Sequence, residues 1–335
     1  MIDLPLIAAG VIALGILFYV VLDGFDLGVG ILFPFAPDHT ARSTMMNSVA
    51  PVWDGNETWL VLGGGGLMVF FPMAYAIVLP AFYMPVMGLL FALIFRGVSF
   101  EFRHSAHTSK RIWDRAFFGG SVMSAFMQGL LLGGLIQGVK VENGVFAGGL
   151  FDWLSPFSVL TGLGVVFGYA LLGATWLVLK TEGKTQSWAR RAAMVAGGGV
   201  IVAMGAVSAL TPLMSPAIQE RWFGGAQVLF LAPVPVLTLG AIVALYWALI
   251  SGRERLPFVF AISLFLLGYL GLGISLWPHI VPPFVTIAEA AAPDKTIIFA
   301  LVGVAITLPM IMFYTWYAYS VFRGKAGAHG GYGDE

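Results

Sequence analysis

Cysteine is absent from this chain of 335 residues. No disulfide framework, thiolate metal site or thiol redox centre can therefore form within it. Charge is also scarce, since Asp, Glu, Lys and Arg make up 10% of the residues, against about 25% in a soluble domain. The 17 basic and 17 acidic residues cancel, so no excess of positive charge favours a nucleic-acid partner.

Hydrophobic residues, in contrast, make up 59% of the chain, and long apolar runs predict membrane-spanning helices. We predict an all-α integral membrane protein that forms a single transmembrane domain over residues 1–335. The nine predicted spans are Leu4–Phe33, Pro51–Phe71, Ala74–Phe95, Ala116–Val139, Pro156–Leu179, Ala192–Leu213, Gln227–Ile250, Pro257–Trp277 and Thr296–Phe322. The count falls to eight if one span is only interfacial. The connection between spans two and three is very short (Phe71, Pro72 and Met73). It predicts that these two spans form an antiparallel hairpin.

The basic residues predict the orientation of the bundle. Alternate connections carry 14 of the 17 Lys and Arg residues, including Arg96 and Arg103, whereas the opposite connections carry only Lys140, Arg221 and Lys295. Because cytoplasmic loops are enriched in Lys and Arg, we expect the N-terminus outside and the C-terminus in the cytoplasm. The Gly-rich segment 324–335 is expected to be a mobile cytoplasmic tail.

Histidine is rare, and its five positions fall in connections or at a span end: His39, His104, His107, His279 and His329. A haem held between helices takes an axial His or Met at membrane depth in most cases. The 14 Met residues are typical of apolar filling in helices. We therefore expect neither a haem nor a structural metal in this chain alone.

Four acidic residues interrupt the apolar segments: Asp23, Asp26, Asp54 and Glu57. Each pair has i,i+3 spacing, so its two carboxyls share one face of a helix. A carboxylate in hydrocarbon costs several kcal/mol unless it has a partner or shifts its protonation. Asp23 lies about 30 Å along its helix from Asp3, near the predicted cytoplasmic end. Span two, which opens with Asp54 and Glu57, begins at the same cytoplasmic end. Glu101 follows span three and is expected on that side as well.

Two interpretations of these acids stay open. They either cap helix ends and pair with Arg96, or they handle protons or cations at a cytoplasmic mouth. Asp54 follows Pro51 in the first turn of a span, where an acid also suits the helix dipole. Glu101 taken alone is typical of a solvated loop charge.

Glycine is concentrated near these acids. Gly24 and Gly28 form a small-xxx-small pair, which predicts close helix packing. The run Gly63–Gly66 predicts contact with a neighbouring backbone or with a bulky flat group, and packing alone is the simpler interpretation.

Four segments carry a resemblance to a known family: DGFDLGVG (23–30), APVWDGNETWLVLGGG (50–65), FRGVSFEFR (95–103) and WPHIVPPFVTIAEAAAP (277–293). The chain resembles subunit II of the cytochrome bd-type quinol oxidases over essentially its whole length. Its compact length and last segment look most like the cyanide-insensitive branch. The resemblance implies two four-helix bundles plus a peripheral helix.

The resemblance also implies a function shared with a partner. Subunit I carries haem b and haem d and oxidises quinol, and the complex reduces dioxygen to water in the bacterial cytoplasmic membrane. This chain is then a haem-free second subunit that stabilises subunit I. A small accessory subunit and a bound structural quinone or lipid are compatible with this assignment.

The resemblance further suggests roles for individual residues. It assigns part of a proton pathway to Asp23 or Asp26, to Asp54 and to Glu101, with Asp54 the first choice beside Trp53 and Asn56. Glu57, the second acid of the Asp54 pair, is expected to join this pathway. Trp59 is expected either to line an oxygen route near the haems or to anchor packing. Arg96 either compensates the acids or approaches a haem propionate across the interface; the alternative is an Arg that merely snorkels at the membrane interface.

Two rival functions are kept. An ion-coupled secondary transporter also uses intramembrane carboxylates and Gly-interrupted helices. A purely structural membrane partner without a proton role is the second alternative. The first predicts a protein that works alone, and the second predicts normal turnover when the acids are neutralised.

Overall fold

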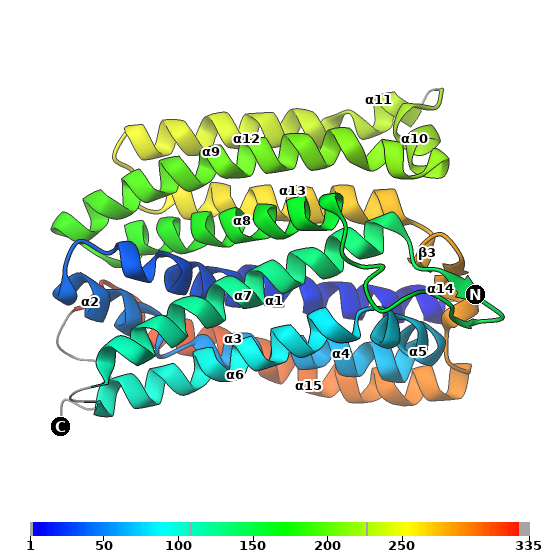
Figure 1. Ribbon diagram of the computed structural model, residues 1–335, viewed down its shortest axis with the longest axis horizontal. Helices are drawn as coiled ribbons and strands as arrows, with labels where there is room; N and C mark the ends of the chain where they lie inside the picture. Colours follow the sequence, from blue (N-terminus) through cyan, green and yellow to red (C-terminus); the bar gives the residue numbers. More distant parts are fainter. Residues whose placement is uncertain (1–2, 107–108, 226, 328–335) are drawn as a thin grey trace.

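Long helices run back and forth along one axis in the computed structural model of the chain (Figure 1). The structure describes residues 3–106, 109–225 and 227–327. His107, His329 and residues 328–335 of the predicted tail therefore lie outside the described residues. The helix α1 (Leu4–Leu32) begins at one end of the long axis, and α15 (Asp294–Val321) runs from that end toward the other (Figure 1).

Eight helices within the described ranges are long and apolar enough to cross a membrane. They are α1 (Leu4–Leu32), α6 (Tyr83–Ser105), α7 (Lys110–Gln137), α8 (Pro156–Lys180), α9 (Gly183–Met214), α12 (Pro233–Ile250), α13 (Leu256–Leu276) and α15 (Asp294–Val321). This confirms the predicted class of all-helical membrane protein. The division into two four-helix bundles and a peripheral helix stays a prediction.

Shorter elements connect these helices. They are η1 (Phe33–Phe35), α2 (His39–Val49), α3 (Trp53–Glu57), α4 (Trp59–Phe70), α5 (Pro72–Ala81), α10 (Pro216–Phe223), α11 (Gln227–Leu231) and α14 (Ile287–Ala290). Two antiparallel hairpins pair β1 (Val141–Glu142) with β2 (Val145–Phe146), and β3 (His279–Val281) with β4 (Val285–Thr286). The β3 hairpin, α5 and α14 lie near the N-terminal end of the molecule (Figure 1).

The predicted second span is divided between α3 and α4, and it does not form a tight hairpin with the third. Phe71 leaves the helical region, with φ −135° and ψ 63°, because the following Pro72 disfavours helical backbone before it. The ten-residue helix α5 then makes the connection, so α6 begins only at Tyr83. Arg96 and Glu101 therefore lie inside α6 rather than in the connection that was predicted to follow the span.

Small residues bring four of the helices together. A Cβ atom on Gly28 of α1 would lie 1.8 Å from the Tyr169 carbonyl oxygen and 2.7 Å from the Gly173 nitrogen of α8. Gly120 of α7 likewise faces the backbone of α6, where its Cβ would lie 3.0 Å from the Arg96 nitrogen. The close helix packing predicted from the glycines is confirmed at Gly28. These contacts fix the positions of the acids on α1 and of Arg96 on α6.

The glycine run in α4 divides into two kinds of position. Gly63 and Gly66 lie against Ile16 and Ile12 of α1, each at 3.1 Å from an added Cβ. Gly64 and Gly65 have nothing within 4 Å. The run therefore packs on α1 through one face and leaves its other face open.

Candidate functional site

Arg96 lies at the centre of a buried charged cluster. Its side chain is fully buried, as are those of Asp23 and Asp26 on α1. Arg96 Nη1 lies 2.7 Å from Asp23 Oδ1 and 3.4 Å from Glu57 Oε2, and Arg96 Nη2 lies 3.9 Å from Asp26 Oδ2. Three carboxyl groups from two chain segments thus surround one guanidinium.

The local structure explains how these groups meet. Asp23 and Asp26 are three residues apart, so the helical repeat turns both toward α6. Glu57 ends the short helix α3, and its side chain keeps 28% of its surface exposed. Trp53, on the same short helix, stacks on Phe100 with ring centroids 4.7 Å apart, and its ring lies 5.8 Å from Arg96 Cζ. The two aromatic rings therefore cover one side of the cluster.

Asn56 connects this cluster to the last helix of the bundle. Its Nδ2 donates to Asp26 Oδ2 at 2.7 Å, and its Oδ1 accepts a hydrogen bond from the Tyr319 hydroxyl at 3.0 Å. Asn56 is buried, and Tyr319 belongs to α15. A continuous hydrogen-bonded path therefore links α15 to an acid on α1.

Several polar atoms of the cluster lack a hydrogen-bond partner among the described residues. They include Asp26 Oδ1, Asp23 Oδ2 and the Nε of Arg96, all of them buried. Buried polar atoms are nearly always paired, and each exception calls for an explanation. Three carboxyls also outnumber one guanidinium, so full ionisation would leave uncompensated negative charge at low dielectric. Such a site is able to take up and release protons.

Not all of the predicted site residues join the cluster. Asp54 is exposed on the first turn of α3, and it forms no ion pair with any described residue. Glu101 is also exposed, on α6. Trp59 is buried and stacks on Phe18 with ring centroids 4.6 Å apart. The structure therefore gathers Asp23, Asp26 and Glu57 with Asn56, Trp53 and Arg96, and leaves Asp54 and Glu101 at the surface.

Three polar residues beside the cluster were missed in the sequence. Gln128 Nε2 donates to the Tyr19 hydroxyl at 3.0 Å, and Gln128 Oε1 accepts from the Tyr169 hydroxyl at 2.5 Å. Tyr19 precedes Asp23 by four residues on the same face of α1, and that spacing was a readable signal. Gln128 was readable as an isolated amide inside an apolar span.

Apolar surface next to the cluster forms an open groove of about 250 Å³ between α1, α4 and α15. Its lining includes Phe18, Trp59, Trp316 and Tyr319. Within the described part of the chain, no group of three or more His, Asp or Glu residues has the geometry of a metal site.

The fold and the cluster together define a polytopic helical membrane protein with a buried carboxylate–guanidinium site. A sequence model of the family described as cytochrome bd terminal oxidase subunit II matches residues 4–322. The chain therefore belongs to this family, as its motifs predicted. It is a subunit of a bacterial respiratory oxidase complex, which implies a subunit I partner.

Individual relatives agree with this membership. Subunit 2 of the cytochrome bd-I ubiquinol oxidase of Escherichia coli strain K12 is 30% identical over an alignment of 356 residues with gaps counted. This alignment covers 94% of this chain and 92% of that one. Subunit 2 of the cytochrome bd ubiquinol oxidase of Bacillus subtilis strain 168 is 29% identical over 342 residues, which cover 96% of each chain. The solved bd oxidase of Geobacillus thermodenitrificans has a similar fold, with a TM-score of 0.78 at 18% identity, over 96% of this chain and 99% of that chain. Membership of the cyanide-insensitive branch stays a prediction.

Proposed function

We propose that this chain is the haem-free second subunit of a quinol:oxygen oxidoreductase and supplies part of a cytoplasmic proton pathway. The observation that carries the proposal is the gathering of Asp23, Asp26 and Glu57 around Arg96, with two of the carboxyls fully buried. Glu57 is the partly exposed member of the cluster. It is therefore the group best placed to exchange protons with the outside of the bundle.

The redox chemistry belongs to the partner in this proposal. Subunit I holds haem b and haem d, and the relatives named as ubiquinol oxidases suggest a quinol as the electron donor. Electrons from the quinol reduce dioxygen, and protons taken from the cytoplasm complete the water that forms. This chain stabilises subunit I, while a small accessory subunit and a structural quinone or lipid are further expected components of the complex.

Orientation determines what the cluster does for the cell. With the N-terminus outside, Asp23 and Asp26 lie near the cytoplasmic end of α1. Quinol oxidation then releases protons at the outer face, while the formation of water consumes protons from the cytoplasm. Together the two reactions create a charge difference across the membrane. No pumping is required for this result.

The electrostatics of the cluster favour a role in proton exchange. Arg96 offsets one negative charge, so one or more of the three carboxyls is expected to retain a proton in the resting cluster. A proton that arrives at one carboxyl can then be passed on from another without creating an isolated buried charge. Proton transfer of this kind needs donors and acceptors within hydrogen-bond reach.

Scaffolding is the second candidate function, and one observation favours it. The Arg96–Asp23 pair is close at 2.7 Å and fully buried, as in a purely structural ion pair. A scaffold predicts that Asp23 matters for assembly and that Asp26 can lose its charge with no effect on turnover. The two functions therefore differ in their predictions for Asp26.

The test is Asp26→Asn in the purified complex with subunit I. Oxygen consumption is expected to fall about 100-fold, because a general acid or base contributes on that scale, while haem content stays at the parental level. Glu182→Gln is the matched control, since Glu182 is exposed just after α8 and lies outside the cluster. Normal turnover in Asp26→Asn, with haem content preserved, would reject the pathway and leave the scaffold, which predicts in turn that Asp23→Asn lowers the yield of assembled complex.

A further inference from the structure

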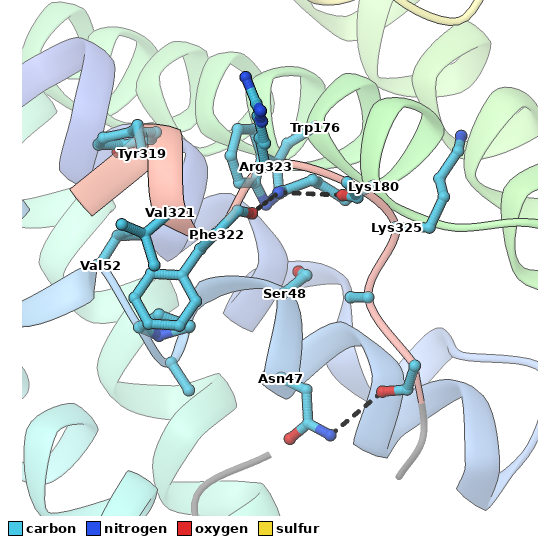
Figure 2. Close-up of a pocket in the computed structure, with 15 residues that line it drawn as sticks. Asn47, Ser48, Val52, Trp176, Lys180, Tyr319, Val321, Phe322, Arg323 and Lys325 are labelled. Atoms are coloured by element: carbon cyan, nitrogen blue, oxygen red, sulfur yellow. Dashed lines mark hydrogen bonds between the residues drawn. The ribbon is translucent and has the colours of Figure 1, made fainter. Parts of the chain in front are cut away.

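The chain passes back over the bundle after its last helix. Residues 322–327, named here the strap, cross the end of α8 (Figure 2). Lys180 Nζ donates to the carbonyl oxygens of Phe322 and Gly324 at 2.6 and 3.1 Å, and the Ala326 amide donates back to the Lys180 carbonyl at 2.7 Å. The first four residues of the predicted mobile tail, 324–327, thus lie along the bundle.

A cavity of about 380 Å³ lies beneath the strap. Its walls come from α2 and the turn after it, from α8, from α15 and from the strap itself, and they include Ser48, Trp176, Lys180 and Tyr319 (Figure 2). A water molecule occupies about 30 Å³ in the liquid, so the space holds roughly ten of them. The hydroxyl of Ser48 and the ammonium of Lys180 give it polar walls. We name this space the strap cavity.

Tyr319 joins the strap cavity to the charged cluster. It lines the cavity, and its hydroxyl donates to Asn56 Oδ1, whose amide nitrogen donates to Asp26 Oδ2. Only two hydrogen bonds thus separate a cavity wall from a buried carboxylate. The other oxygen, Asp26 Oδ1, is buried and has no hydrogen-bond partner among the described residues. The path ends at Oδ2, and Oδ1 is therefore the free acceptor of the same carboxyl group.

We propose that the strap cavity is a hydrated chamber from which protons reach Asp26 Oδ1 past Tyr319 and Asn56. The inference rests on the proposed function and adds a second entrance to the cluster beside Glu57. In the transfer, an O–H bond of a hydronium ion in the chamber breaks and an O–H bond forms at Asp26 Oδ1. The carboxylate becomes a carboxylic acid and water remains. Tyr319 and Asn56 are positioning residues, which hold Oδ2 and order the water that bridges the gap.

The hydration of the chamber is tested by thiol labelling, which suits this chain because it contains no cysteine. Ser48→Cys places one thiol in the cavity wall of the complete complex, and the probe is a small, charged, membrane-impermeant methanethiosulfonate. Ala174→Cys on α8 is the buried control, since Ala174 is fully buried and does not line the cavity. Ser251→Cys, after α12, is the exposed control. Intact mass of the chain reports the modification.

The Ser48→Cys chain is expected to be labelled about tenfold or more faster than the Ala174→Cys chain, because only a hydrated thiol ionises and reacts readily. Sealed vesicles of each orientation then show that labelling occurs from the side that carries the C-terminus. A Ser48→Cys chain that reacts no faster than the buried control until the complex is denatured overturns the proposal.

The link to Asp26 is tested by Tyr319→Phe, which keeps the ring and removes the hydroxyl. Oxygen consumption is expected to fall about fivefold, in line with the loss of one hydrogen bond. The solvent deuterium isotope effect on turnover is expected to rise, because proton arrival becomes slower. Tyr317→Phe is the matched control, since Tyr317 lies on the exposed side of the same helix.

The outcomes separate this inference from the function on which it rests. If Asp26→Asn slows turnover while Tyr319→Phe changes neither turnover nor the isotope effect, the pathway stands and the chamber is wrong. If Asp26→Asn has no effect, the pathway itself fails. Should Tyr319→Phe fail to assemble, the labelling of Ser48→Cys in the otherwise parental complex still decides the question of hydration.

Discussion

Two groups of charged side chains, one around Arg96 and one around the strap, lie in different surroundings. The Arg96 cluster is buried, with three carboxyls against one guanidinium and several atoms without hydrogen bonds. At the strap, Lys180 donates to two carbonyls, and Lys325 donates to the Thr181 carbonyl and to Glu254 at 3.1 and 2.8 Å. The two lysines at the strap therefore donate hydrogen bonds to backbone carbonyl and carboxylate oxygens, and their surroundings are partly exposed to solvent.

This difference indicates what each group can do. An exposed ion pair is screened by solvent and contributes little to stability, so the strap charges hold the segment weakly and reversibly. A buried cluster with an excess of acid is costly to assemble, and its protonation depends on its partners. Substitutions are therefore expected to act strongly at Arg96 and weakly at the strap.

Arg96→Leu is expected to have the largest effect. It leaves Asp23 and Asp26 buried without a counter-charge, and breaking a buried pair in this way costs about 3–5 kcal/mol. The yield of assembled, haem-containing complex and its thermal midpoint measure this loss. Arg191→Leu, at an exposed position on α9, is the control and is expected to behave like the parent.

A double variant sharpens the same comparison. Arg96→Leu combined with Asp23→Leu removes both members of the closest pair, so assembly is expected to recover in part. A parental thermal midpoint for Arg96→Leu alone would contradict the view that this guanidinium holds the acids in place.

Gly28→Ala is expected to have the next largest effect, because it displaces the helix that carries both buried acids. The new Cβ would lie 1.8 Å from the Tyr169 carbonyl oxygen, which is backbone and cannot rotate away. Overpacking of this kind costs about 1–3 kcal/mol or more, and the thermal midpoint of the complex reports it. Gly10→Ala on the same helix has open space within 4 Å and is expected to be neutral or slightly stabilising. Equal midpoints for the two variants would show that α1 and α8 separate at little cost.

The sequence predicted those features that depend on one helix at a time. The length of the apolar runs predicted a helical membrane protein and most of its spans. The i,i+3 spacing predicted that Asp23 and Asp26 share one face of their helix. The pair Gly24 and Gly28 gave the close contact of α1 with a neighbour. In each case the residues that decide the feature lie on a single helix.

Features that join distant segments were harder to predict. The choice among Asp54, Glu57 and Glu101 depends on which way α3 and α6 rotate, and single-helix patterns do not fix that rotation. Arg96 was assigned to a connection because α5 was taken as part of a span, although Phe71 before Pro72 was a readable break. Tyr319 meets Asn56 across 263 positions of sequence, and no local pattern relates the two.

Glu254→Gln at the strap is expected to have the smallest effect. Hydrogen bonds from Lys325 and Gln186 lower the pKa of the Glu254 carboxyl below its usual value. The contribution of this pair is therefore present at neutral pH and is lost as the pH falls through that lowered pKa. Glu254→Gln removes the ion pair at every pH, so hydrogen exchange at the Ala326 amide is expected to speed up about twofold at neutral pH. Glu182→Gln is expected to leave that exchange unchanged, because Glu182 forms no ion pair with Lys180 or Lys325 in the described part of the chain. Equal exchange in both variants would mean that the hydrogen bonds to backbone carbonyls hold the strap without the Lys325–Glu254 ion pair. The exposed ion pair would then be dispensable, in contrast to the buried one.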